Sequence, residues 1–214
     1  LTCAGTITSS LFSDKLLHRF GAGKVTAVSI TITAVAMFGF SIGSQVWMFW
    51  LWAIPYGLGA GGVDAILNNY VALHYKAQHM SWLHCMWGVG ASIGPYIMSF
   101  VLTRGKIWNT GYLYVGIIQT VLTFIILMSL PIWDKTNDGS VEKKMKSLSL
   151  KEVISIPGTK SVMILFFCYC AIEQTTGLWA SSYLVLFKGI PEEIAARFGG
   201  LFFIGITIGR ALSL

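Results

Sequence analysis

The chain has 214 residues, of which 55% are hydrophobic and only 11% are charged, and its mean hydropathy is +0.69. Soluble domains carry roughly 25% charged residues, so this composition excludes an ordinary soluble domain and indicates a polytopic helical membrane protein. The net charge of +6 would suggest nucleic-acid binding in a soluble chain, but we attribute it to membrane topology and expect no nucleic-acid partner.

Apolar segments recur along the whole chain. Five exceed the ~18 apolar residues typical of a membrane-spanning helix, and we predict complete helices over residues 25–43, 46–74, 80–103, 111–133 and 161–187. We expect residues 1–13 and 196–214 to be two further spans, truncated by the ends of a fragment. Because lipid offers the backbone no hydrogen-bond partners, the predicted fold is all-α.

The polar residues between the spans indicate the orientation. We expect residues 14–24 to form a cytoplasmic loop, and alternate loops then take their sides from it. On this assignment most of the 15 Lys and Arg residues lie on the cytoplasmic side. This asymmetry satisfies the positive-inside rule.

The second complete span contains one carboxylate, Asp64. An Asp at the membrane centre costs about 2.5–3.5 kcal/mol on insertion scales, and such residues usually face a cavity and serve function. Gly57, Gly61, Asp64 and Asn68 recur at helical spacing, so we expect one face directed at protein or water. Helix packing through the glycines, and an interhelical hydrogen bond or ion pair for Asp64, are the alternatives.

Two other spans carry comparable faces. One is formed by His84, Trp87, Gly88, Ala91 and Pro95, and the other by Glu173, Thr176, Gly177, Ala180 and Ser181. Arg210 is a candidate ion-pair partner for either intramembrane acid, although an Arg near a helix end also often extends to the membrane surface. His74, His79 and His84 are five residues apart, which rotates each by about 140° from the last, so we expect no metal site.

Residues 134–160 form the one long, charged connection, and we predict that it links two membrane halves, 1–133 and 161–214. Ser149 and Glu152 fit a capping box, with Leu148 and Val153 at the positions of a hydrophobic staple. Because Pro157 ends this pattern, we predict a short amphipathic helix over residues 149–156 at the membrane surface.

The segment SSLFSDKLLHRFGAGKV (residues 9–25) resembles the signature loop that follows the second helix in the major facilitator superfamily. Its acidic, basic and glycine positions are supplied by Asp14, Lys15, Arg19, Gly21 and Lys24, with Ser10 where a glycine is usual. In the family this loop ties helices together in one state of the transport cycle and does not bind substrate.

Later segments resemble the fucose-permease-like branch of proton-coupled sugar importers. VDAILNNY (63–70) is similar to its fourth helix, with Asp64 where Glu is usual and Asn68-Asn69 where Asn-Pro is usual. MSWLHCMWGVGASIGP resembles the fifth helix, CAIEQTTGLWASSYLV the seventh and GGLFFIGITIGRALS the eighth. The resemblance implies a partial major facilitator fold, about seven of twelve helices, from within the second to within the eighth.

The resemblance also implies a function. We expect a secondary active transporter rather than an enzyme: a monomer in the cell membrane of a bacterium that moves a small polar solute, a sugar, by proton-coupled alternating access. It needs the lipid bilayer and a proton gradient but no cofactor. A proton-coupled exporter of drugs or hydrophobic cations is the alternative within the family. A seven-helix receptor or channel and an intramembrane hydrolase are less well supported, because no ring of pore charges and no nucleophile–base pair is visible.

The candidate site residues follow from these patterns. Asp64 aligns with the protonatable carboxylate of the branch, and Glu173 is the second candidate for proton coupling. Hydrogen bonds to solute hydroxyls are expected from Asn68, Asn69, His84 and Gln174, and stacking on a sugar ring from Trp87 and Trp179. Trp179 has interfacial anchoring as its alternative.

Overall fold

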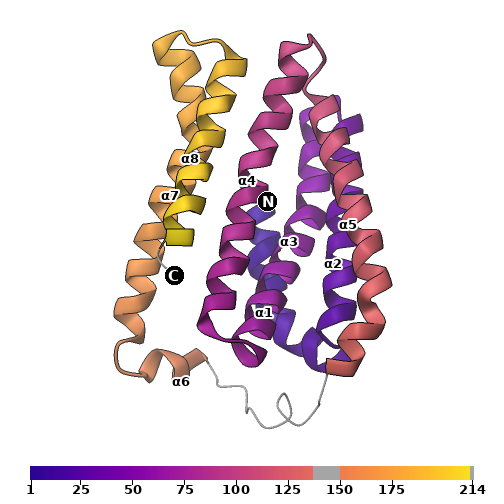
Figure 1. Ribbon diagram of the computed structural model, residues 1–214, viewed down its shortest axis with the longest axis vertical. Helices are drawn as coiled ribbons and strands as arrows, with labels where there is room; N and C mark the ends of the chain where they lie inside the picture. The colour runs from indigo at the N-terminus through magenta and orange to yellow at the C-terminus, as the bar shows by residue number, and fades with distance from the viewer. Residues whose placement is uncertain (137–149, 213–214) are drawn as a thin grey trace.

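The computed structural model describes residues 1–136 and 150–212, and all regular structure in them is helical (Figure 1). The helices are α1 (Thr2–Phe20), α2 (Ala22–Ile42), α3 (Val46–His74), α4 (Ala77–Thr103), α5 (Asn109–Thr136), α6 (Leu150–Ser155), α7 (Thr159–Lys188) and α8 (Glu192–Leu212). Within the described residues, the six helices α2, α3, α4, α5, α7 and α8 are long and apolar enough to cross a membrane. The predicted all-α fold class is confirmed.

The predicted spans agree closely with these helices. Helix α3 begins and ends at the predicted residues, 46 and 74, and the other complete spans differ by a few residues at each end. Helix α8 starts at Glu192, before the predicted start of the last span at residue 196, and is long enough to cross a bilayer. Helix α1 is not among the six candidate spans.

The predicted loop over residues 14–24 is also wrong, because α1 continues to Phe20 and α2 starts at Ala22. Asp14 lies 3.4 Å from His18, one turn later on the exposed side of α1, so the polar residues extend the helix rather than end it. Gly21 alone makes the turn, with φ 80°, a conformation that glycine adopts without steric cost.

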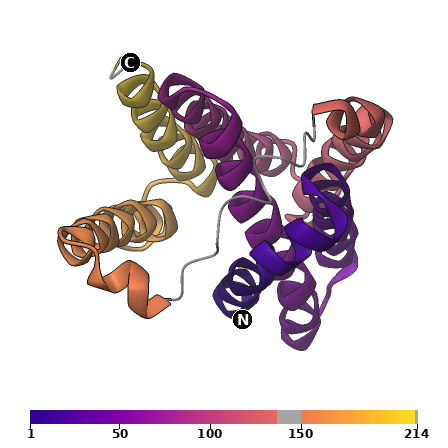
Figure 2. The same cartoon turned by 90° about the horizontal axis from the view of Figure 1, so that it is seen from below.

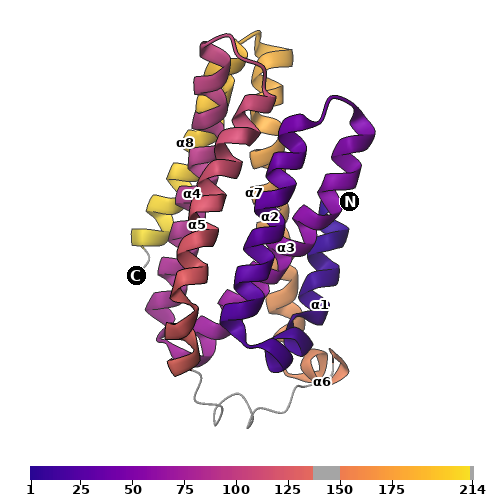
Figure 3. The ribbon, with the colours of Figure 1, turned by 90° about the vertical axis from the view of Figure 1, so that its right-hand side faces the viewer.

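The helices form two groups that meet at α4. Seen from below, the first group, formed by α1, α2, α3 and α5, lies on one side, and the second group, formed by α7 and α8, lies on the other (Figure 2). In the first group α3 packs against α1 and α2, and α2 also packs against α5 (Figure 3). Helix α4 contacts α3 and α5 only sparsely and packs mainly along α8. Helix α4 therefore joins the two groups, through extensive contact with α8 and sparse contact with α3 and α5.

Glycines bring the helices of the first group into close contact. A Cβ atom added at Gly61 of α3 would lie 2.5 Å from the carbonyl oxygen of Thr6 in α1, and one added at Gly59 would lie 2.5 Å from that of Ser29 in α2. Gly57 contacts the backbone of Thr2 in the same way. The glycine face of α3 is thus a packing surface, the alternative that the sequence left open.

Helix α6 confirms the predicted short helix, and it lies at the same end of the molecule as the α1–α2 turn (Figure 1). Ser149 and Leu148, the predicted cap and staple residues, are outside the described residues. The division into two halves with a linker over 134–160, and the placement of α6 at a membrane surface, stay predictions.

Candidate functional site

Arg210 of α8 is the centre of a polar cluster that joins three helices. Its Nη1 donates a hydrogen bond to the backbone carbonyl of His84 in α4 at 3.2 Å. Its Nη2 donates to the hydroxyl of Tyr169 in α7 at 2.6 Å and to Oε2 of Glu173 at 3.4 Å. The guanidinium carbon lies 5.2 Å from the centre of the Trp87 ring in α4. We call these five residues the Arg210 junction.

The Glu173 side of the junction lies near the middle of α7, the longest of the three helices. Glu173 is about 21 Å along α7 from Thr159, at 1.5 Å per residue. The Glu173 side chain is 8% exposed and that of Arg210 is 24% exposed. Each charge is expensive at membrane depth on its own, so the pair lowers the cost of placing both there. Tyr169 and Trp87 are more open, at 44% and 43% exposed.

A second polar group lies on α3. The Asn68 side-chain amide donates to Oδ1 of Asp64 at 3.0 Å, across one helical turn. The Asp64 side chain is exposed, whereas Oδ1 of Asn68 is buried and has no hydrogen-bond partner among the described residues. We call this pair the Asp64 dyad. The dyad lies on α3, whereas the Arg210 junction is formed by α4, α7 and α8, and α3 does not pack against α7 in the described structure.

The structure brings together some of the predicted site residues and not others. His84, Trp87 and Glu173 meet in the Arg210 junction, although His84 takes part through its carbonyl rather than its imidazole. Asn68 joins Asp64. The remaining three are outside both groups: Asn69 is half-buried on α3, and Gln174 and Trp179 are exposed on α7.

The sequence reasoning missed one member of the junction, Tyr169. Its position four residues before Glu173 places both side chains on one face of α7, and this spacing was the available signal. Arg210 had been considered as a partner of either acid, and the structure places it with Glu173.

The residues of the signature segment lie away from both groups. Asp14 pairs with His18, while Lys15 and Arg19 lie over the rings of Phe12 and Phe20 at 5.6 and 5.3 Å.

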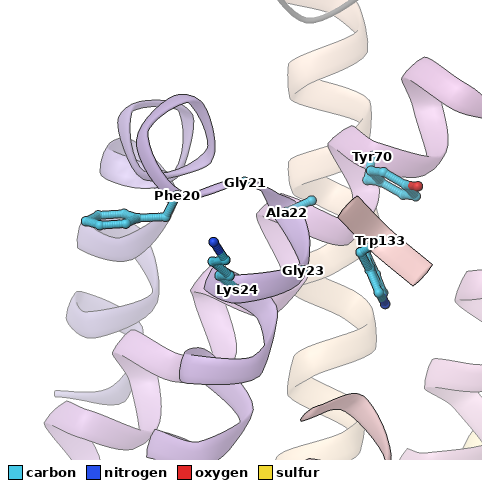
Figure 4. A pocket seen from close by; sticks show the side chains of 7 residues that line it. All are labelled: Phe20, Gly21, Ala22, Gly23, Lys24, Tyr70 and Trp133. Atoms are coloured by element: carbon cyan, nitrogen blue, oxygen red, sulfur yellow. The ribbon is translucent and has the colours of Figure 1, made fainter. Parts of the chain in front are cut away.

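Gly21 of the α1–α2 turn and Lys24 of α2 border a small cavity together with Tyr70 of α3 and Trp133 of α5 (Figure 4). A Cβ at Gly23 would come within 2.9 Å of Cβ of Trp133, so the turn packs directly on α5.

The described residues contain no group of three His, Cys, Asp or Glu side chains placed to hold a metal ion. The two groups offer hydrogen-bond donors and acceptors, and the Arg210 junction also contains an ion pair.

Comparisons with known proteins agree with this architecture. The sequence profile of the family described as Major Facilitator Superfamily matches residues 1–214. The chain is 24% identical over 231 residues to Bypass of stop codon protein 6 of Saccharomyces cerevisiae (strain ATCC 204508 / S288c). That match covers 96% of this chain and 46% of the yeast protein, so the chain spans about half the length of this relative. No solved structure matches the chain.

Proposed function

This chain belongs to the major facilitator superfamily, and on that premise we propose that it is part of a secondary active transporter for a small polar solute. The solute class we propose is a sugar, taken up together with protons by alternating access, as in the fucose-permease-like branch. The cell membrane is the proposed location.

The Asp64 dyad is the observation that carries this proposal. Asp64 lies about 27 Å along α3 from Val46 and about 15 Å from His74, at 1.5 Å per residue, and so within the membrane. The exposed carboxylate of Asp64 is a hydrogen-bond acceptor that a solute can reach. It needs donors, and the hydroxyl groups of a sugar are donors of the right kind.

Proton coupling follows from the chemistry of the same pair. An ionised Asp64 only accepts hydrogen bonds, whereas a protonated Asp64 also donates one. The dyad therefore binds a polyhydroxylated solute differently in its two protonation states. A ligand that binds two states unequally shifts the equilibrium between them, and in the superfamily this shift takes the form of the two halves rocking about a midplane site.

The exposed carboxylate also supports a second candidate, an exporter of hydrophobic cations. Asp64 is exposed among apolar helices, and Trp179 of α7 is 65% exposed. A carboxylate and an open aromatic ring suit an organic cation, through charge and cation–π attraction. The same assay separates the two candidates.

The test is transport by the full-length protein in liposomes, with hexoses, deoxyhexoses and hydrophobic cations as probes. We expect a sugar gradient to drive proton influx in the wild type. Asp64→Asn should abolish this influx while sugar counterflow continues, because the amide cannot exchange the proton. Glu192→Gln, which removes an exposed carboxylate at the start of α8, is the matched control and should retain coupling.

Two results would contradict the proposal. Exchange of cations against protons, with no sugar moved, would replace the sugar importer by the exporter. Sugar-driven proton influx that survives in Asp64→Asn would remove Asp64 from the coupling step.

A further inference from the structure

We propose that the Arg210 junction binds a carboxylate group of a transported solute, so that the sugars moved by this transporter include sugar acids. This inference rests on the proposed function, because it assigns the solute class for the same transporter. It assigns to Arg210 a role in binding in addition to its structural contacts.

The first argument is the geometry of the ion pair. Charge-assisted N–H···O contacts between Arg and a carboxylate are typically 2.7–2.9 Å long and often bidentate. Arg210 instead reaches Glu173 through one nitrogen and one oxygen at 3.4 Å. Its shorter contact is to the neutral hydroxyl of Tyr169, at 2.6 Å. The internal carboxylate is thus a weakly held partner that a second carboxylate can replace.

The second argument is access. Arg210 is 24% exposed, whereas Glu173 is 8% exposed, so an incoming anion reaches the guanidinium before the internal acid. A charged side chain at membrane depth faces a cavity or protein rather than lipid. The open side of the junction is therefore where we place the solute.

The third argument is the surroundings of the guanidinium. Trp87 lies against it at 5.2 Å and Tyr169 contacts it directly, and both rings are more than two-fifths exposed. Aromatic rings with one polar neighbour suit a ligand that has an apolar face and a polar edge. A pyranose ring with a carboxylate substituent has both.

Proton coupling at this site keeps the charge balanced. A proton binds to Oε2 of Glu173, and the N–H of Arg210 that bonded to this oxygen bonds to the solute carboxylate instead. The ion pair of Arg210 with Glu173 becomes an ion pair of Arg210 with the solute, beside a neutral acid. One anion enters with one proton, so no uncompensated charge is left at membrane depth.

In the part of the chain that the structure describes, the groups around this exchange include the Tyr169 hydroxyl on the same helix as Glu173 and the backbone carbonyl of His84 on α4.

The experiment compares glucuronate with glucose, two ligands with the same ring that differ by a carboxylate. Binding to the full-length protein is measured from acidic to neutral pH, and uptake is measured in liposomes. We expect glucuronate to bind and move with protons. Arg210→Gln should weaken glucuronate binding at least ~10-fold, the loss expected for one hydrogen-bonded charge. Arg210→Lys should retain part of it, because the charge remains.

Glu173→Gln provides the more specific readout. A neutral amide leaves Arg210 without its internal competitor, so glucuronate binding should lose its pH dependence and uptake should lose its proton coupling. Arg197→Gln is the matched control, since Arg197 is also on α8 and contacts Ser99 of α4. It should leave both properties unchanged.

The outcomes separate the two proposals. Proton-coupled uptake of glucose without glucuronate binding overturns the carboxylate site and leaves the sugar transporter standing. Glucuronate binding that is equal in folded Arg210→Gln and wild type also overturns it. Transport of cations alone overturns the proposed function itself.

Discussion

Helices α2 and α7 are both apolar enough to cross a membrane but differ in how they are held. Helix α2 buries about half of its residues, most of them small, such as Ala27, Ser29, Ala34 and Ala36. Helix α7 is longer, yet Glu173 is the one described residue on it that is buried. An apolar helix surface gains little when it exchanges lipid for another helix. Close contact between helices therefore depends on small residues and polar contacts. Close packing of small residues holds α2 in place, whereas α7 makes few contacts, and the Arg210 junction is one of them.

The largest expected effect is in the first group of helices, where α1 and α3 pack closely. Gly61→Leu places side-chain atoms where the Thr6 carbonyl of α1 already lies, 2.5 Å from the new Cβ, and neither backbone can yield easily. We expect about 3 kcal/mol or more of destabilisation, seen as loss of monodisperse protein after detergent extraction. Gly94→Leu is the control, because a Cβ at Gly94 has no neighbour within 4 Å. Equal yields for the two variants would show that α1 and α3 are not in close contact.

An intermediate effect is expected in the Arg210 junction. Glu173→Gln and Arg210→Gln each leave one charge without its partner at membrane depth, and we expect each to cost about 2 kcal/mol of stability. The double variant should cost less than the sum of the two, because no lone charge remains. Thermal unfolding of all four proteins in detergent measures this coupling. Strict additivity would show that the pair does not hold α7 against α8.

The smallest expected effect is in the first group of helices, at the end opposite the α1–α2 turn. The Asn109 side chain donates hydrogen bonds to the carbonyls of Gly43 and Ser41, at 2.8 and 3.2 Å, and ties α5 to the α2–α3 turn. Asn109→Ala should cost about 1 kcal/mol, because two weak contacts are lost while aromatic packing remains. Thr110→Ala, at the neighbouring residue, should change the unfolding temperature less. If Asn109→Ala lost more stability than Glu173→Gln or Arg210→Gln, the Asn109 contacts would matter more for stability than the ion pair.

The neighbouring aromatic residues explain the modest size of this effect. Phe40 stacks on Phe49 with ring centres 5.7 Å apart, and Phe49 lies 5.4 Å from Trp108. These contacts join α2, α3 and the start of α5 without help from Asn109.

The boundaries of the spans could be predicted because every segment that crosses the bilayer must be apolar over the thickness of the hydrocarbon layer. The bounds of α3 agree for that reason. Hydropathy could not predict that α1 continues past Asp14, because charged residues outside the membrane occur in helices and in loops alike. The turn at Gly21 depends on one backbone conformation that several glycines in the sequence could have adopted.

The candidate site was predicted in part. Helical periodicity placed His84 near Trp87, because positions three apart share a face. Tyr169 and Glu173 are four apart and also share a face, but Tyr169 was not predicted. Periodicity within a helix carries no information on which faces meet, so it could not decide whether Arg210 pairs with Asp64 or with Glu173.

The sequence by itself determined the all-α membrane fold, its spans and the two intramembrane acids, since each depends on the cost of burying charge or backbone in lipid. The tertiary structure alone decided that α8 packs along α4, that the glycines of α3 face α1 and α2, and that Arg210 joins Glu173 to His84 and Trp87. These are contacts between residues up to 126 positions apart, and they depend on shape and charge complementarity between helices rather than on any one segment.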